Sequence, residues 1–151
     1  MIHLIKTDAS NLDFIDLVKH LDVYLAKMDG DAHEFYDQYN RIENLKEVIV
    51  VYKNGEAVAC GAIKPFDAAT VEVKRMYVNP DYRGEGIATT VLLALEKWAL
   101  ELGFSEAILE TGNSYHDAIA LYIKNGYFQI PNYGQYVESD LSACYKKYLK
   151  R

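Results

Sequence analysis

The residues best suited to chemistry lie in the stretch RGEGIA, residues 83–88, between a run of β-branched and aromatic residues and a clean helical pattern. The N-terminus of a helix exposes unpaired backbone N–H groups and carries a partial positive charge. Glycines let such a backbone approach a ligand closely, and Arg83 adds a cation suited to phosphate. A bare G-x-G is also typical of a simple turn. Taken alone, the stretch is therefore either a tight turn or an anion-binding loop.

Two common kinds of phosphate loop are excluded at this position. A Walker-type loop needs Gly-Lys-Ser/Thr, whereas the second glycine here is followed by Ile87 and Ala88. A dinucleotide-binding fingerprint needs a third glycine where Thr89 stands, and it follows the first strand of a βαβ unit, whereas this loop follows a later strand. An anion bound here would therefore belong to another class of ligand.

Hydrophobic patterns predict the elements that must position this loop. Strands are predicted at residues 2–6, on both sides of the hairpin signal Asn54-Gly55, at 70–78, at 106–111, and twice in the tail, within 127–136 and 142–150. Helices are predicted from Leu12 to Met28, over 31–40, over 85–102, and from Ser114 to Asn125. Gly103 and Gly126 are expected to end the last two helices, and Ser114 with Asp117 resembles a capping box.

The helix over residues 85–102 presents a continuous apolar face. That face comprises Ile87, Ala88, Val91, Leu92, Leu95, Trp98, Ala99 and Leu102. Strands 70–78 and 106–111 flank this helix, so they are predicted to be parallel through a right-handed crossover, while the hairpin makes the sheet mixed. We therefore predict one α/β domain over residues 1–151, with a mixed central sheet of about six to seven strands flanked by about four helices.

Composition excludes several classes of function. The chain has 151 residues and a formal net charge of −6, which argues against general nucleic-acid binding because that function needs a basic face. No apolar run approaches the ~18 residues of a membrane span, and the N-terminus lacks the pattern of a signal peptide. Cys60 and Cys144 are too few for a disulfide framework, and the four histidines show no metal-ligand spacing. We expect a cytoplasmic protein that binds no metal, membrane or nucleic acid.

Two signatures together indicate a family. The stretch RGEGIA with its flanks resembles the R-x-x-G-x-G/A loop, strand and helix of the GNAT superfamily of acetyl-CoA-dependent N-acetyltransferases. DAIALYIKNGY, residues 117–127, resembles that family's second signature, A-x-x-L-Y-x-x-x-G-F/Y. The predicted order of elements is similar from the first strand to the last, so the resemblance covers essentially the whole chain. It implies a GNAT-like fold and acetyl-CoA as co-substrate.

The resemblance also implies how acetyl-CoA would be held. The loop amides would grip the pyrophosphate of coenzyme A, and the residues concerned are Arg83, Gly84, Gly86, Ile87, Ala88 and Thr89. The preceding strand usually carries a bulge and splays from its parallel neighbour, which lets the pantetheine arm pair with the backbone of Met76, Tyr77 and Val78. A backbone N–H near Met76 or Tyr77 would polarise the acetyl carbonyl and hold the oxyanion.

Two side chains match catalytic positions of the family. Glu72 would be the base that removes the proton of the attacking amine, directly or through a water. The alternative for Glu72 is an ion pair with Lys74 or Arg75. Tyr122 would be the general acid at the cofactor sulfur, or would only donate a hydrogen bond to it. The alternative for Tyr122 is a core tyrosine on an amphipathic helix.

The acceptor amine is expected to bind near tyrosine-rich segments. In this fold the helices after the first strand and the last loops border the acceptor site. The residues predicted to shape it are Phe35, Tyr36, Tyr39, Tyr133 and Tyr136. Glu34 or Asp37 would attract a cationic acceptor. An equally good interpretation is that these tyrosines simply pack beneath a polar surface.

Four further residues are weaker candidates for roles near the site. The family often has an asparagine that contacts pantetheine where this chain has Tyr115, and Asn113 lies close by. His116 could relay a proton, and a solvated histidine is the alternative. Cys144 could carry an acyl group, but no histidine lies nearby in sequence to activate it, which favours a small buried hydrophobe.

These observations predict an N-acetyltransferase that moves acetyl from acetyl-CoA directly to a primary amine of a small-molecule acceptor. Two alternatives stay open: a protein or peptide N-acetyltransferase, and a non-catalytic module that binds acyl-CoA. Glu72 and Tyr122 argue against the module. We expect a monomer or homodimer.

Overall fold

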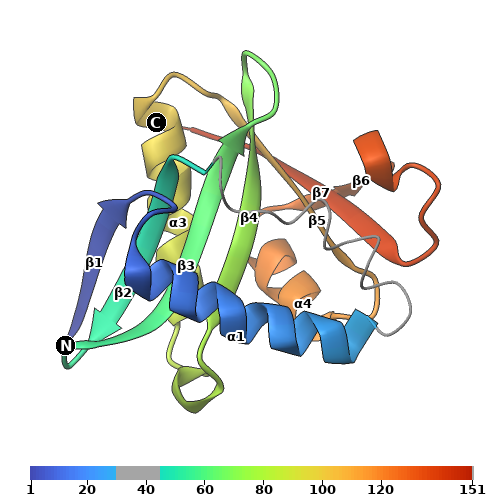
Figure 1. Cartoon of the computed structure of the whole chain (residues 1–151). Helices are drawn as coiled ribbons and strands as arrows, with labels where there is room; N and C mark the ends of the chain where they lie inside the picture. The colour runs from blue at the N-terminus through green and yellow to red at the C-terminus, as the bar shows by residue number, and fades with distance from the viewer. Residues whose placement is uncertain (30–44, 151) are drawn as a thin grey trace. The chain divides into compact units, whose positions relative to one another are not determined.

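The structure, a computed structural model, describes residues 1–29 and 45–150. The elements of the described chain follow the predicted order (Figure 1). The strands are β1 (Ile2–Thr7), β2 (Glu47–Lys53), β3 (Glu56–Pro65), β4 (Thr70–Val78), β5 (Glu106–Gly112), β6 (Phe128–Ile130) and β7 (Ser142–Tyr148). The helices are α1 (Leu12–Asp29), α3 (Ile87–Glu101) and α4 (His116–Lys124), with 3₁₀ turns η2 (Pro80–Tyr82) and η3 (Gly134–Tyr136). The helix predicted over 31–40 lies outside the described residues.

The strands form one mixed seven-stranded sheet in the order β1-β2-β3-β4-β5-β7-β6. β4 and β5 pair in parallel, as the crossover rule predicts, whereas β1 with β2, β2 with β3, β5 with β7 and β6 with β7 are antiparallel. The predicted α/β fold with a mixed sheet of six to seven strands is therefore confirmed.

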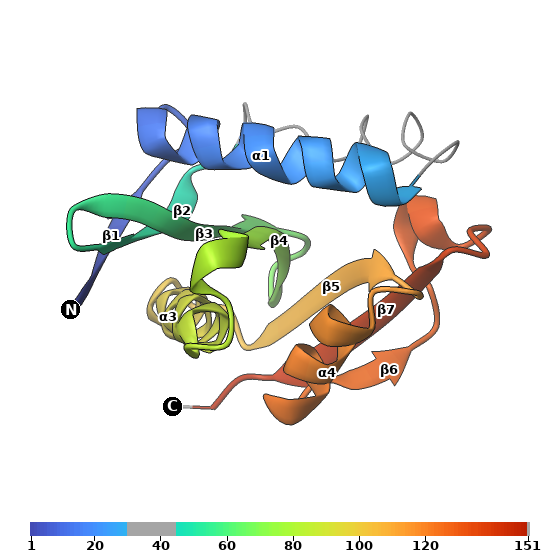
Figure 2. The same ribbon diagram turned by 90° about the horizontal axis from the view of Figure 1, so that it is seen from below.

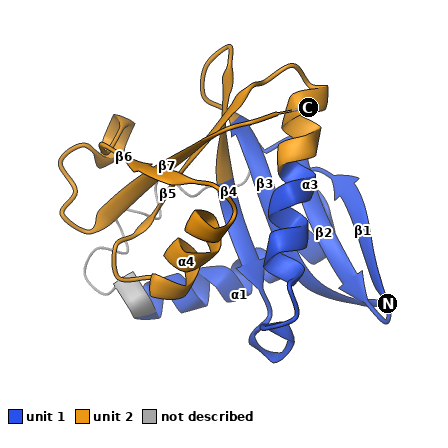
Figure 3. Cartoon of the chain, turned by 180° about the vertical axis from the view of Figure 1, so that it is seen from behind, with its two compact units in different colours: residues 1–64, 74–95 blue, residues 65–73, 96–151 orange. Residues whose placement is uncertain are grey.

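The chain divides into two compact units (Figure 3). Unit 1 comprises residues 1–64 and 74–95, and unit 2 comprises residues 65–73 and 96–151. The backbone of β4 and of α3 runs from one unit into the other. The prediction of a single domain over residues 1–151 stays a prediction.

In unit 1, α1 covers one face of β2 and β3, and the N-terminal part of α3 covers the other (Figure 2). The α1 side is a cluster of buried side chains: Phe14, Leu17, Val18, Leu45, Val48, Val50, Cys60 and Ala62. Gly61 faces the opposite side, where a Cβ at this position would lie 2.8 Å from Val91 and 3.0 Å from Leu95 of α3. Successive residues of β3 therefore face two apolar layers, one on each side of the sheet. Gly61 has no side chain, which lets α3 approach the strand closely.

Turn chemistry explains where the elements end. Asn54 and Gly55 both have positive φ, 53° and 85°, which is the conformation that a two-residue hairpin turn needs, and the predicted hairpin is confirmed. Gly103 has φ 98° and Gly126 has φ 96°. Both helix ends close with the paired hydrogen bonds of a Schellman motif, Phe104 N to Ala99 O and Tyr127 N to Tyr122 O being the outer ones.

Two details of the prediction are wrong. Leu102 is 47% exposed because α3 ends at Glu101, so the residue leaves the buried face of the helix. The N-cap of α4 is Tyr115, which makes no side-chain capping hydrogen bond, so Ser114 does not form the predicted capping box. A turn in which Tyr115 N donates to Gly112 O sets the start of α4 instead.

Replacing Gly61 with alanine should destabilise the protein by about 1–3 kcal/mol, because the new methyl group would lie 2.6 Å from Met76 Sδ, 2.8 Å from Val91 and 3.0 Å from Leu95. Without this overlap the same change would stabilise the protein by about 0.4–1 kcal/mol, because alanine lowers the conformational entropy of the unfolded chain. The sign of the change in unfolding free energy therefore shows whether the overlap occurs. Urea denaturation measures the free energy of unfolding. In a Val91→Ala background the cost should shrink; an unchanged cost there would show that the overlap with Val91 is not responsible.

Candidate functional site

The glycine loop contains a turn that only glycine adopts easily. Gly84 and Gly86 have φ values of 81° and 79°, and a Cβ at either would meet no heavy atom of the described chain within 4 Å. The space beside the loop is therefore open, and left-handed backbone rather than crowding requires the glycines. α3 starts at Ile87, and its first intrahelical acceptor is Gly86 O, which Thr90 N contacts at 3.1 Å. The N–H groups before Thr90 thus point out of the helix end.

The turn that precedes this loop is held by its own polar groups. Asn79 Oδ1 accepts a hydrogen bond from Asp81 N at 2.9 Å, and Asn79 N donates to Val58 O of β3 at 2.8 Å. Arg83 Nε donates to Val78 O at 3.1 Å, and its guanidinium lies 5.7 Å from the centre of the Tyr24 ring. These contacts fix the end of β4 relative to the helix N-terminus. They also keep the arginine cation beside the loop.

β4 changes its conformation at Arg75. Its parallel ladder with β5 comprises the pairs from Thr70–Glu106 to Glu72–Ile108, all in unit 2, whereas β4 itself continues to Val78. Arg75 has φ 58°, a left-handed value that costs a residue of this type about 1–3 kcal/mol. The expected bulge and splay of this strand stay a prediction. Met76, Tyr77 and Val78 follow it, half-buried, in unit 1.

Glu72 lies in a buried, hydrogen-bonded setting in unit 2. The residue is 8% exposed, and Tyr133 donates its hydroxyl to Glu72 Oε2 at 2.7 Å. The Tyr133 ring makes edge contacts with Phe66 and Tyr136, with ring centres 5.3 and 5.8 Å away. Burial, and then the Glu72 charge, raise the pKa of Tyr133, so the phenol stays a donor. Of the two alternative partners for Glu72, Lys74 and Arg75, Arg75 pairs with Asp22.

Tyr122 is also buried, at 7% exposure, on α4. Its ring packs edge-on against Tyr127, with the ring centres 5.7 Å apart. Burial and then the charge of Glu110 raise the pKa of Tyr122 above its ordinary value. The phenol is therefore neutral throughout the physiological range and keeps a proton that it can donate.

Comparison with known proteins identifies the family of this chain. The family model of the acetyltransferase (GNAT) family matches residues 14–127. The chain belongs to this family. It is an acyltransferase, and acetyl-CoA is the acyl donor that the family uses. The open space and outward N–H groups at the start of α3 fit the pyrophosphate of that donor.

Relatives of this GNAT enzyme agree with the family model. An IAA acetyltransferase of Azospirillum brasilense is 32% identical over 135 residues, which is 88% of this chain and 88% of the relative. A solved structure from Klebsiella pneumoniae, assigned as an acyl-CoA N-acyltransferase, is 30% identical with a TM-score of 0.83 and covers 99% of both chains. A GNAT structure from Elizabethkingia anophelis with acetyl-CoA bound shares the fold, with 21% identity, a TM-score of 0.72 and 98% of both chains covered.

The site residues predicted for this enzyme fall in both units. Unit 1 holds Met76–Val78 and the loop through Thr89, whereas unit 2 holds Glu72 with Tyr133 and Tyr136, and also Tyr122. Phe35, Tyr36 and Tyr39, with Glu34 and Asp37, lie outside the described residues. Their predicted part in the acceptor site stays a prediction.

The structure also shows how the weaker candidates are placed. Burial raises the pKa of Cys144 to about 11, so this thiol is protonated at neutral pH. Asn113 uses its side-chain amide to donate to Asp140 O at 2.7 Å. His116 is exposed at the first position of α4. The Asn113 side chain thus binds a backbone carbonyl, and Cys144 is a buried residue.

Sequence reasoning missed a buried ionic cluster in unit 2. Glu96, only 7% exposed, accepts hydrogen bonds from the Tyr127 hydroxyl at 2.9 Å and from Lys147 Nζ at 2.7 Å. Glu96 stands one turn after Leu92 on the apolar face of α3, and a charged residue there was the available signal. The hydrogen bond to Glu96 holds Tyr127 in place, and the Tyr127 ring packs against Tyr122.

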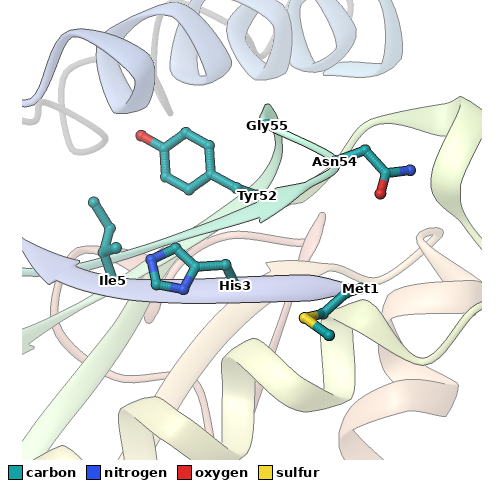
Figure 4. A pocket seen from close by; sticks show the side chains of 6 residues that line it. All are labelled: Met1, His3, Ile5, Tyr52, Asn54 and Gly55. Carbon is teal, nitrogen blue, oxygen red and sulfur yellow. The ribbon is translucent and has the colours of Figure 1, made fainter.

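A shallow hollow beside β1 is made of residues with no predicted role in the enzyme. It is lined by Met1, His3, Ile5, Tyr52, Asn54 and Gly55 (Figure 4). Within the described ranges, no group of three or more acidic, histidine or cysteine side chains is arranged to hold a metal ion. In the same ranges, no helix is long and apolar enough to cross a membrane.

Alkaline pH should unfold the enzyme as its buried tyrosines ionise. Burial is the first cause that raises the pKa of Tyr122, Tyr127, Tyr133 and Tyr136. Their unfolded pKa is about 10, so their contribution to stability is complete below that pH and is lost as the pH rises above it. Absorbance at 295 nm with circular dichroism should show these residues ionising together with unfolding. Ionisation of all 13 tyrosines with the dichroism intact would contradict this.

Proposed function

We propose that this GNAT enzyme transfers acetyl from acetyl-CoA directly to a primary amine of a small-molecule acceptor. The observation that carries the proposal is the buried Glu72 carboxylate, held by the Tyr133 hydroxyl at 2.7 Å, on the strand that leads to the cofactor loop. Direct transfer is supported by the two cysteines of the chain, because burial raises their pKa values to about 12 for Cys60 and about 11 for Cys144. Neither thiol offers a thiolate that could carry the acetyl group.

Binding of acetyl-CoA would use backbone groups of unit 1. The loop from Arg83 to Thr89 would hold the pyrophosphate through its amides, the α3 dipole and the Arg83 cation. The backbone of Met76, Tyr77 and Val78 would pair with the pantetheine arm, and an N–H there would face the developing oxyanion. Support comes from the left-handed backbone at Arg75, an irregularity within β4 immediately before these residues.

Proton transfer would use two side chains of unit 2. Glu72 would accept the proton of the attacking amine, directly or through a water, while Tyr133 keeps the carboxylate in place. Tyr122 would donate a hydrogen bond at the sulfur position. Its raised pKa supports this role more than complete proton transfer, because a weaker acid protonates a thiolate of ordinary pKa about 8.5 less readily.

The general test is release of free thiol from acetyl-CoA with panels of small amines, amino acids and peptides. Thiol release with small amines supports the proposal, whereas release only with peptides or proteins supports the alternative acceptor class. Saturable acetyl-CoA binding without release for any acceptor would identify a non-catalytic module.

Replacing Tyr122 with phenylalanine should lower kcat about tenfold or more and change the KM for acetyl-CoA little, because the hydroxyl acts on the reacting sulfur and the ring keeps its packing. Steady-state kinetics measure both constants. Tyr148→Phe, at a 57% exposed tyrosine, is the matched control. An unchanged kcat in the Tyr122 variant would rule out the assigned role.

Replacing Glu72 with glutamine should lower kcat about 10²-fold or more, since the amide cannot accept the amine proton. Tyr133→Phe, which removes only the hydrogen bond to this carboxylate, should have a smaller effect in the same direction. Glu138→Gln, an exposed acidic residue, serves as control. Equal activity of the Glu72 variant and the control would eliminate Glu72 as base.

A further inference from the structure

Arg75 is buried but only partly hydrogen-bonded. Its side chain is 2% exposed, and one nitrogen, Nη2, pairs with Asp22 of α1. The other two nitrogens, Nε and Nη1, are buried and find no hydrogen-bond partner in the described part of the chain. Buried polar groups are nearly always satisfied, since a donor removed from water without a partner destabilises the fold. Two such donors on one cation therefore require an explanation.

The position of Arg75 suggests that these two nitrogens belong to a ligand-binding site. Its left-handed backbone, φ 58°, lies within β4 immediately before Met76, the start of the segment proposed to hold the pantetheine arm and the acetyl carbonyl. The Arg75 carbonyl accepts from Cys60 Sγ of β3 at 3.5 Å, which anchors the strained residue on the core side. Strained residues with unsatisfied groups concentrate where ligands bind.

The charges restrict what the unsatisfied donors could bind. Asp22 balances the Arg75 cation, and its side chain is 42% exposed while the guanidinium is buried. A doubly charged phosphate placed here would be repelled by Asp22. A carboxylate has one charge and accepts N–H groups in the geometry that a guanidinium presents, so it is the better complement.

We propose that Arg75 binds the carboxylate of an acceptor that carries both a primary amine and a carboxylate, as an amino acid does. This inference rests on the proposed acetyl transfer and names its class of substrate. Nε or Nη1 would donate to the acceptor carboxylate while Asp22 keeps Nη2 and so fixes the orientation of the guanidinium. The amine end of the acceptor would then be directed toward the segment that begins at Met76.

The test compares α- and ω-amino acids with the matched amines that lack the carboxylate, using thiol release from acetyl-CoA by the full chain. We expect kcat/KM to be about tenfold or more higher for the amino acids. Arg75→Gln should remove this preference by lowering kcat/KM for the amino acids more than for the carboxylate-free amines. Glutamine has a Cβ like arginine, so the backbone strain at this position is retained. Lys64→Gln, at an exposed basic residue of unit 1, is the control.

Asp22→Asn gives a second variant with the opposite expectation. The amide still accepts from Nη2 but no longer repels an anion, so KM for amino acids should fall while KM for the matched amines stays constant. Equal kcat/KM for amino acids and amines in the wild-type protein would overturn the inference and leave acetyl transfer intact. The inference also fails if Arg75→Gln slows both classes of acceptor equally or raises only the KM for acetyl-CoA.

Binding without turnover separates this inference from the proposed function. Calorimetric titration with N-acetylglycine and with its methyl ester should show binding of the acid alone, lost in Arg75→Gln. Such binding without thiol release from any acceptor would support Arg75 and refute the transfer reaction. No binding and no release would refute both.

Discussion

The left-handed backbone at Arg75 is the constraint around which this enzyme is arranged. Before it, β4 pairs in parallel with β5 up to Glu72, and after it the strand carries Met76–Val78 toward the glycine loop. A regular strand would continue its ladder and use its backbone groups within the sheet. The parallel ladder with β5 ends at Glu72, and the left-handed residue at Arg75 costs about 1–3 kcal/mol. Glu72, the proposed base, and Met76–Val78, the proposed cofactor segment, lie on either side of this residue in β4.

Buried polar pairs restrict the packing of side chains in unit 2. Glu72 with Tyr133, and Glu96 with Tyr127 and Lys147, are carboxylates removed from water and compensated by donors at 2.7–2.9 Å. Such pairs add little net stability, but a wrongly packed alternative would leave a carboxylate unsatisfied. Their effect is therefore to restrict the tyrosine rings to one arrangement. Tyr122, which packs against Tyr127, takes its position from this network.

Local patterns account for most of the fold. The hairpin at Asn54-Gly55, the glycine stops at Gly103 and Gly126, and the parallel crossover are predictable because each depends on residues close in sequence or on a general rule of handedness. The errors lie at element ends. The pattern predicts that Ser114 caps α4, but a turn from Gly112 to Tyr115 determines the helix start, which the pattern of side chains does not encode.

The sequence by itself determined the order of elements, the family and the residues that match its two signatures, because these follow from short-range periodicity and motif spacing. Only the tertiary structure showed that Tyr133 donates to Glu72, 61 positions away, and that Arg75 is buried with two nitrogens that have no hydrogen-bond partner among the described residues. The physical reason is that burial and hydrogen bonding depend on contacts between distant segments, which periodicity does not specify. The sequence pattern of a strand therefore does not predict whether a charged side chain will contact water, a carboxylate or a ligand.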